Sequence, residues 1–150
     1  MISAAQCLTR YGDPRLERNL AVFLMPPELL SHNPSLPKKI YANRDIHHAL
    51  SAALYKCRDK GVLREIVTFD GCFNIRLIRG GSSSSLHSWA IAIDFCAKKF
   101  PLGMTRAGAV AAGVIPFSQT FIDCWKQTGW DWGGDFARAD MMHFQISRLP

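Results

Sequence analysis

The first half of the chain has hydrophobic positions at helical spacing. Asp13-Pro14 has the residue types of an N-cap and a first helical position, and apolar residues recur at helical spacing from Leu16 to Leu24. The segment after Asp45 also has one apolar face and stops at Gly61, so a second helix is expected there. Between them, residues 26–37 contain four prolines and are expected to be irregular.

The second half of the chain combines short strand patterns with one helix. Strands are expected at Glu65–Phe69, Phe73–Ile78, Ala90–Phe95 and Met142–Ser147, with the turn Asp70-Gly71 between the first two. Ser118–Gln127 has the pattern of a helix that ends before Gly129. This order of elements predicts an α+β fold, with a small central antiparallel sheet flanked by helices, in a single domain spanning residues 1–150.

The charge of the chain bears on its partners. The 150 residues carry a formal net charge of +6, which draws a protein toward polyanions such as nucleic acid, anionic membranes or anionic cell-wall polymer. The basic residues are spread along the chain without a basic arm or stripe, so we expect no nucleic-acid partner. No stretch approaches the roughly 18 apolar residues of a membrane span, so no stable membrane insertion is expected.

The cysteine pattern and the first residues of the chain allow the cellular compartment to be predicted. The five cysteines are Cys7, Cys57, Cys72, Cys96 and Cys124, and no two of them have CxxC spacing. Scattered cysteines in odd number predict free thiols in a reducing cytoplasm, and neither a cysteine zinc site nor a disulfide framework. The first residues lack the apolar run of a secretory signal, so we expect synthesis in the cytoplasm without a signal peptide.

Four side chains in the second half have the types and order of a catalytic metal site. His87 follows a serine-rich loop, and Asp94 belongs to an apolar strand, where an unpaired carboxylate is costly and a metal would be a partner. His143 opens the last expected strand, and Asp140 precedes it by three residues. Three ligands and a spare acid suit an open zinc site, although hydrogen-bonding roles are the commoner outcome of such spacing alone.

Ordered motifs strengthen the metal hypothesis. The segment from Ser85 to Asp94 resembles the SxHxxGxAxD signature of the zinc D-Ala-D-Ala carboxypeptidase and L-alanyl-D-glutamate endopeptidase family, with Ala90 where the signature has glycine. Residues 140–144 resemble the second motif of that family, an acid three residues before the last ligand. Residues 69–76 and 129–136 resemble segments of its phage endolysin branch, so the resemblance extends over half of the chain.

The resemblance implies a role for each matching residue. It makes His87, Asp94 and His143 the ligands of Zn²⁺, and it makes Asp140 the general base that later protonates the leaving amine. Further residues are expected around them: Arg76, or its rival Arg79, polarises the carbonyl or grips a substrate carboxylate, and Ser85 braces the site near His87 or contacts substrate.

Two tryptophans are candidates for a wall of the cleft. Trp130 and Trp132 could stack on sugar rings or line the cleft, and one of them is expected in the core. We expect Trp132 to be the substrate contact. The family fold that the resemblance implies is a small α+β domain with a central antiparallel sheet, shared with hedgehog signalling domains.

The resemblance implies hydrolysis of a peptide bond in the peptidoglycan stem peptide. The leading hypothesis is a monomeric L-alanyl-D-glutamate endopeptidase that acts as a phage endolysin on the bacterial cell wall or in the periplasm, where positive charge would favour an anionic envelope. A D-Ala-D-Ala carboxypeptidase is the alternative enzyme. A non-catalytic, zinc-containing wall-binding module is the alternative outside the enzymes. A basic nuclease is less supported, because no phosphate-binding cluster is evident.

Overall fold

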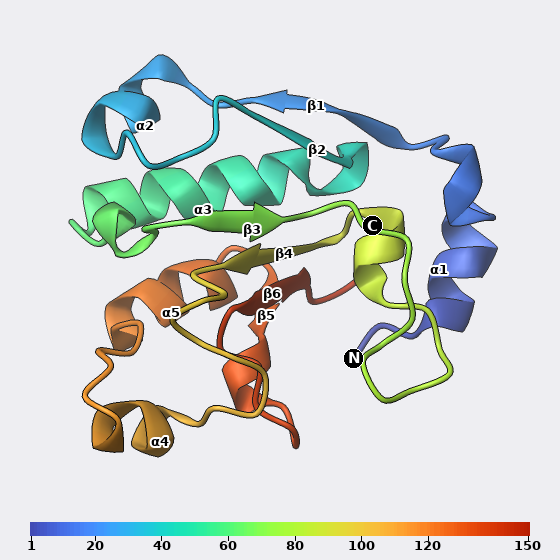
Figure 1. Cartoon of the computed structure of the whole chain (residues 1–150). Coiled ribbons are helices and arrows are strands. Elements are labelled where there is room, and N and C mark those ends of the chain that lie inside the picture. The colour runs from blue at the N-terminus through green and yellow to red at the C-terminus, as the bar shows by residue number, and fades with distance from the viewer.

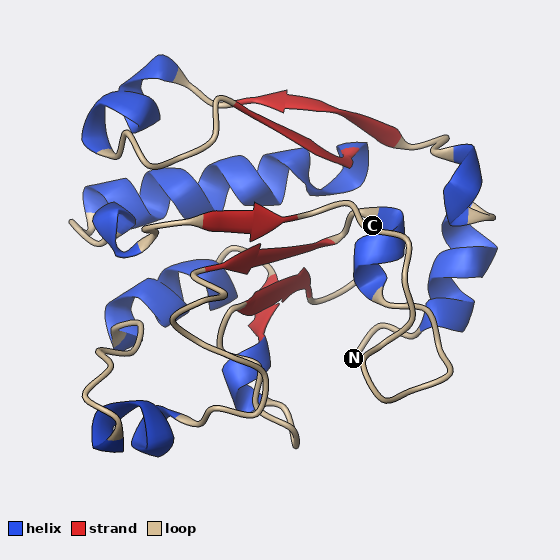
Figure 2. Ribbon diagram, in the orientation of Figure 1, coloured by secondary structure: helices blue, strands red, loops and turns tan.

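The computed structural model describes residues 1–150 and contains two antiparallel sheets with five α-helices (Figures 1 and 2). The helices are α1 (Ala4–Tyr11), α2 (Pro27–His32), α3 (His47–Asp59), α4 (Arg106–Ala111) and α5 (Gln119–Lys126). The strands are β1 (Leu20–Leu24), β2 (Lys39–Asn43), β3 (Phe69–Gly71), β4 (Ala92–Phe95), β5 (Trp130–Trp132) and β6 (His143–Ile146). The predicted α+β class is confirmed. None of the helices has both the length and the apolar character needed to cross a membrane.

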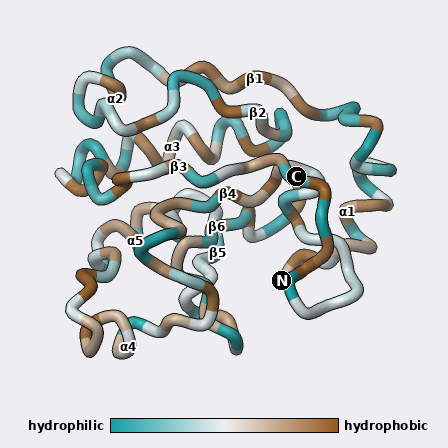
Figure 3. Tube along the Cα trace, in the orientation of Figure 1, coloured by the Kyte–Doolittle hydropathy of each residue, from teal (hydrophilic) through white to brown (hydrophobic).

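The first helix predicted from the sequence is wrong, because the segment forms a 3₁₀ turn and then a strand. Pro14–Leu16 is the turn, and β1 follows it and pairs with β2 from Leu20↔Asn43 to Leu24↔Lys39. A spacing of four residues between leucines fits both a helix and the alternation of a strand, so the pattern was ambiguous. Figure 3 shows β1 as hydrophobic along its length, although Leu24 faces solvent.

The two other predicted helices are confirmed. The Asn43 side chain accepts a hydrogen bond from the Asp45 backbone N–H at 3.0 Å and starts the turn that leads into α3. The N-cap of α5 is Ser118, whose hydroxyl accepts from the Phe121 backbone N–H at 3.1 Å. Both helices bury the faces that the sequence pattern indicated, and they pack against each other beside the larger sheet.

The larger sheet has the strand order β3-β4-β6-β5. The predicted strand Glu65–Phe69 is wrong except at Phe69, because the observed β3 consists of Phe69 and the predicted turn Asp70-Gly71. Residues 73–78 form no strand beyond an isolated bridge from Leu77 to Ser84. The apolar residues of that segment did not indicate a core strand, since Leu77 and Ile78 are exposed. The two later strands are confirmed as β4 and β6, whereas the short strand β5 was not anticipated.

The central strands place polar and apolar side chains on opposite faces. In β6, Phe144 lies in the aromatic core with its ring 4.9 Å from that of Trp125 on α5. Alternation along the strand puts His143 and Gln145 on the other face. Asp94 is the direct partner of His143 across the β4–β6 pair. The sheet therefore brings a candidate ligand pair together on its polar face, backed by the core.

Candidate metal centre

The backbone around His87 is held by hydrogen bonds from the serine-rich loop. His87 lies in a 3₁₀ helix, Leu86–Trp89, whose N-cap is Ser85. The Ser85 hydroxyl accepts from the His87 backbone N–H at 3.4 Å, and the Ser85 backbone N–H donates to the Arg76 carbonyl at 2.9 Å. Ser85 is buried and lies where it can brace His87.

The imidazole of His87 is oriented by a backbone carbonyl. Its Nδ1 lies 2.9 Å from the carbonyl oxygen of Cys72, and the ring is buried. A carbonyl oxygen can only accept, so Nδ1 carries the proton. In the neutral ring the lone pair is then on Nε2, which lies 3.2 Å from Asp94 Oδ1 and 3.2 Å from His143 Nδ1.

A side-chain amide orients the second imidazole in the same way. His143 Nε2 lies 3.1 Å from Gln145 Oε1, so that nitrogen donates and the lone pair is on Nδ1. Nδ1 in turn lies 3.0 Å from Asp94 Oδ1. Both rings therefore keep their N–H groups at the periphery and turn their lone pairs inward.

Three electron-pair donors consequently face one another, an arrangement that suits a cation. The donor atoms of His87, Asp94 and His143 all lie within 4.8 Å of one another and could hold a metal ion. Ligand atoms at tetrahedral zinc, about 2.0–2.2 Å from the ion, lie about 3.3–3.6 Å apart. The 3.0–3.2 Å separations seen here are slightly shorter, so small side-chain shifts would fit the three groups to zinc.

The electrostatics of Asp94 agree with a cation site. Burial alone would raise the pKa of this carboxyl, but the contacts with His143 and His87 outweigh burial and hold the pKa well below its usual range. The carboxylate thus stays ionised at neutral pH. A charged oxygen beside two imidazole lone pairs is a typical donor set for a divalent transition metal.

Asp140 lies in the turn before β6 and has the properties of a proton acceptor. Its carbonyl accepts from the His143 backbone N–H at 3.0 Å, and its own N–H donates to the Gly133 carbonyl at 2.9 Å. Its Oδ1 is buried without a hydrogen-bond partner. Burial raises the pKa of this carboxyl, as does the charge of Asp94, while His143 and Arg79 act in the opposite direction. An under-coordinated carboxylate beside the donor set is a candidate general base.

The Gly133 position lets this turn approach the strand closely. A β-carbon added there would overlap the Asp140 carbonyl oxygen and lie 3.0 Å from the His143 β-carbon. Only glycine leaves that space, so Gly133 maintains the spacing between the acid and the last ligand.

The metal centre opens into a cavity of about 540 Å³ that Asp94, Asp140 and His143 line. Three arginines also line it, Arg76, Arg79 and Arg138, and none forms a salt bridge. The Arg138 Nη1 donates to the Arg79 carbonyl at 3.3 Å, whereas the Arg76 Nη1 donates to the Leu77 carbonyl at 3.3 Å. Both arginines proposed from the sequence therefore reach the cavity, and Arg79 is the one whose charge acts on Asp140.

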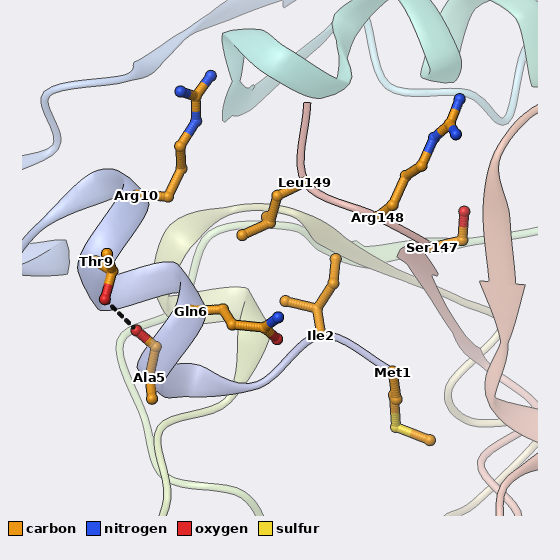
Figure 4. Close-up of a pocket in the computed structure, with 9 residues that line it drawn as sticks. All are labelled: Met1, Ile2, Ala5, Gln6, Thr9, Arg10, Ser147, Arg148 and Leu149. Atoms are coloured by element: carbon orange, nitrogen blue, oxygen red, sulfur yellow. Dashed lines mark hydrogen bonds between the residues drawn. The ribbon is translucent and has the colours of Figure 1, made fainter.

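A larger hollow of about 840 Å³ lies between α1 and the C-terminal residues and shares Met1 and Ile2 with the metal cavity (Figure 4). Its lining includes Arg10 and Arg148 and has no histidine, cysteine or carboxylate side chain. It therefore offers no metal ligand, and the smaller cavity is the better candidate for chemistry.

The expectation that Trp132 contacts substrate needs correction. Trp132 is only 4% exposed, and its indole N–H donates to the Met141 carbonyl at 2.9 Å. It is not among the residues that line the metal cavity. Trp130 is buried as well, next to Trp125 of α5. Both tryptophans support the strands from the core, which buried aromatic rings with a satisfied N–H commonly do.

Ala90 adopts a backbone conformation that explains why the SxHxxGxAxD signature has glycine at this position. Its φ and ψ are 53° and 40°, in the left-handed region, and its side chain is buried. An alanine in the left-handed region lowers the stability of the fold by about 1–2 kcal/mol. The departure from the signature thus costs stability without displacing a ligand.

Gln145 and Gly133 were missed from the sequence. Gln145 could have been found, because a residue two positions after His143 on a strand shares its face. The sequence did not indicate the close approach at Gly133 except by the Gly133-Gly134 pair, because the contact depends on the fold of residues 133–143.

Comparison with known proteins agrees with this geometry. Residues 79–146, somewhat under half of the chain, match the family model described as D-alanyl-D-alanine carboxypeptidase. Searches of curated proteins and of solved structures gave no match. The matched segment includes His87, Asp94, Asp140 and His143. The match supports a relationship of this segment to the D-Ala-D-Ala carboxypeptidase-like zinc peptidases.

Proposed function

We propose that the chain is a zinc metallopeptidase that hydrolyses a peptide bond in the peptidoglycan stem peptide. The observation that carries the proposal is the convergence of His87 Nε2, Asp94 Oδ1 and His143 Nδ1, whose lone pairs are directed inward by the contacts of the two rings. Three protein ligands leave a fourth position for water or substrate, as in catalytic zinc sites. The match to a D-alanyl-D-alanine carboxypeptidase model supports peptidoglycan as the substrate.

The side chains of the cavity have different roles in the proposed reaction. A bound zinc ion supplies a Lewis acid and lowers the pKa of water to about 7. Asp140 accepts the proton of the attacking water, for which its unpaired oxygen is available, and then gives that proton to the leaving amine. Arg76 and Arg79 orient the substrate by binding its carbonyl or carboxylate oxygens.

More narrowly, we propose that the chain is a monomeric L-alanyl-D-glutamate endopeptidase that acts as a phage endolysin. It would be made in the cytoplasm and act on the cell wall. The net charge of +6 supports attraction to an anionic envelope. The motifs of residues 69–76 and 129–136, which resemble the endolysin branch, support the choice of bond.

A D-Ala-D-Ala carboxypeptidase is the second candidate, and one observation favours it. The three cavity arginines form no salt bridge and could receive the free carboxylate that such a substrate presents. The family that matches residues 79–146 is described by the same activity.

Product analysis distinguishes these candidates. Purified peptidoglycan is incubated with the zinc-loaded protein, with and without a chelator, and new termini are identified by mass spectrometry. Chelator-sensitive cleavage between L-Ala and D-Glu is expected. Release of terminal D-Ala alone would replace the endopeptidase by the carboxypeptidase. Tight zinc binding without any cleavage would contradict both and favour a wall-binding module.

A further inference from the structure

Gln145 is a cavity residue that the proposed mechanism leaves without a task. It lies on β6, two residues after His143, and its side chain is only 4% exposed. It lines the metal cavity together with Asp140 and His143. We propose that Gln145 is a bifunctional residue: it positions His143 for metal binding, and its amide N–H donates a hydrogen bond to an oxygen of the bound peptide. The second role rests on the proposed peptidase function.

The positioning role follows from the Oε1 contact. Gln145 Oε1 lies 3.1 Å from His143 Nε2 and accepts its proton, which leaves the lone pair on Nδ1. The reversed amide would set an NH₂ group against this N–H, so the two donors would repel each other. Partners of this kind fix the tautomer and ring direction of histidine ligands, and their loss typically weakens metal binding about 10–100-fold.

The donor role follows from the other end of the same amide. Gln145 Nε2 is buried and has no hydrogen-bond partner. Buried polar groups are nearly always paired, so an unpaired N–H on the wall of an open cavity indicates a missing acceptor. Gln145 lines the same cavity as Asp94, Asp140 and His143, so a peptide bound in that cavity would pass its side chain.

The chemistry of the acceptor is a carbonyl or carboxylate oxygen of the stem peptide. Asp131, the cross-strand neighbour of Gln145 on β5, makes no hydrogen bond to it, so the fold itself does not satisfy the donor. An amide N–H binds either kind of oxygen. A pair of peptide substrates with the glutamate α-carboxyl group free or amidated separates the two sources.

Two substitutions separate the roles. Gln145→Glu keeps an oxygen that can accept from His143 but removes the N–H donor, whereas Gln145→Met removes both at similar size. Gln127→Glu and Gln127→Met are matched controls, because Gln127 is exposed at the end of α5. Zinc affinity is measured by competition with a chromophoric chelator, the His143 tautomer by ¹⁵N NMR, and kcat and KM on a stem peptide.

Gln145→Met is expected to weaken zinc binding about 10–100-fold and to change the His143 tautomer, whereas Gln145→Glu keeps zinc affinity within about threefold. Gln145→Glu is expected to raise KM about tenfold with little change in kcat, as loss of uniform substrate binding requires. A rise in KM confined to the substrate with the free carboxyl group identifies a carboxylate acceptor. A rise in KM for both substrates identifies a carbonyl acceptor.

Three results would overturn parts of this inference. Wild-type zinc affinity in Gln145→Met would remove the positioning role, and wild-type KM in Gln145→Glu would remove the donor role. A wild-type protein that binds zinc and cuts no stem peptide would overturn the proposed function and the donor role with it. The zinc and NMR measurements would still decide the positioning role, because neither requires catalysis.

Discussion

Asp94 and His143 are direct partners across the antiparallel strands β4 and β6, and Asp94 Oδ1 lies 3.0 Å from His143 Nδ1. Side chains at such paired positions share one face of a sheet. The two residues lie 49 positions apart in sequence, and the pairing of β4 with β6 brings them together. His87 joins them from a 3₁₀ helix outside the sheet, which makes the donor set depend on both elements.

Replacing any member of the donor set is expected to remove stoichiometric metal. Asp94→Ala and His143→Ala each leave two of the three ligands, so bound zinc should fall from one ion per chain to nearly none after dialysis. Mass spectrometry of the metal content checks this. His48→Ala is the control, because His48 is exposed on α3 and should leave the zinc content unchanged. Full zinc content in Asp94→Ala would disprove the assignment.

Metal removal is expected to lower thermal stability. A ligand present at about 1,000 times its Kd stabilises the folded state by about 4 kcal/mol. For a chain of this length that corresponds to a decrease in Tm on the order of 10 °C when a chelator removes zinc. Differential scanning calorimetry measures the change. The same chelator should leave the Tm of His143→Ala unaltered, and an equal decrease in that variant would point to another metal site.

Gly133→Ala is expected to damage the metal centre from outside the donor set. The new methyl group would overlap the Asp140 carbonyl and press on His143, so zinc affinity and hydrolysis should each fall about tenfold or more. Gly81→Ala serves as the control, because its β-carbon would meet nothing closer than 3.5 Å. Isothermal titration with zinc gives the comparison, and equal affinities in the two variants would contradict the close approach.

Ala90 offers a test of backbone strain. Ala90→Gly relieves the left-handed conformation but loses a buried methyl group, so the free energy of unfolding should stay within about 1 kcal/mol. Ala90→Val should cost more than about 2 kcal/mol, since a β-branched residue tolerates this conformation poorly. Urea denaturation measures both. Ala111→Val, exposed at the end of α4, should cost well under 1 kcal/mol, and a similar loss at both sites would contradict the account.

The sequence allowed the parts of the fold with a single consistent pattern to be predicted. The helices after Asp45 and Ser118 combine an apolar face with a terminator or cap. The strand at 92–95 belongs to an apolar run that Asp94 interrupts, and the strand at 143–146 alternates polar and apolar residues. Strand β1, which pairs with β2, was not predicted, because leucines four residues apart fit both the helical and the strand period. Residues 73–78 have apolar character without burial, which no local pattern reveals.

The site was partly predictable for a different reason. His87, Asp94, Asp140 and His143 are close in space, as the motifs implied, because ligand types and spacing are local properties of the chain. The role of Trp132 was misjudged, since a tryptophan in a glycine-rich segment has the same appearance whether it faces the cavity or the core. Gln145 and Gly133 matter through contacts that exist only in the folded chain.

The most direct test of a zinc peptidase is the Asp140→Asn variant, assayed for zinc content and for the initial rate of stem-peptide hydrolysis beside the wild type. Asp140 is not in the donor set, so the variant should keep one zinc per chain. Loss of the proton acceptor should lower kcat by about 10²–10⁴-fold. A variant that binds zinc and hydrolyses at the wild-type rate would contradict the account.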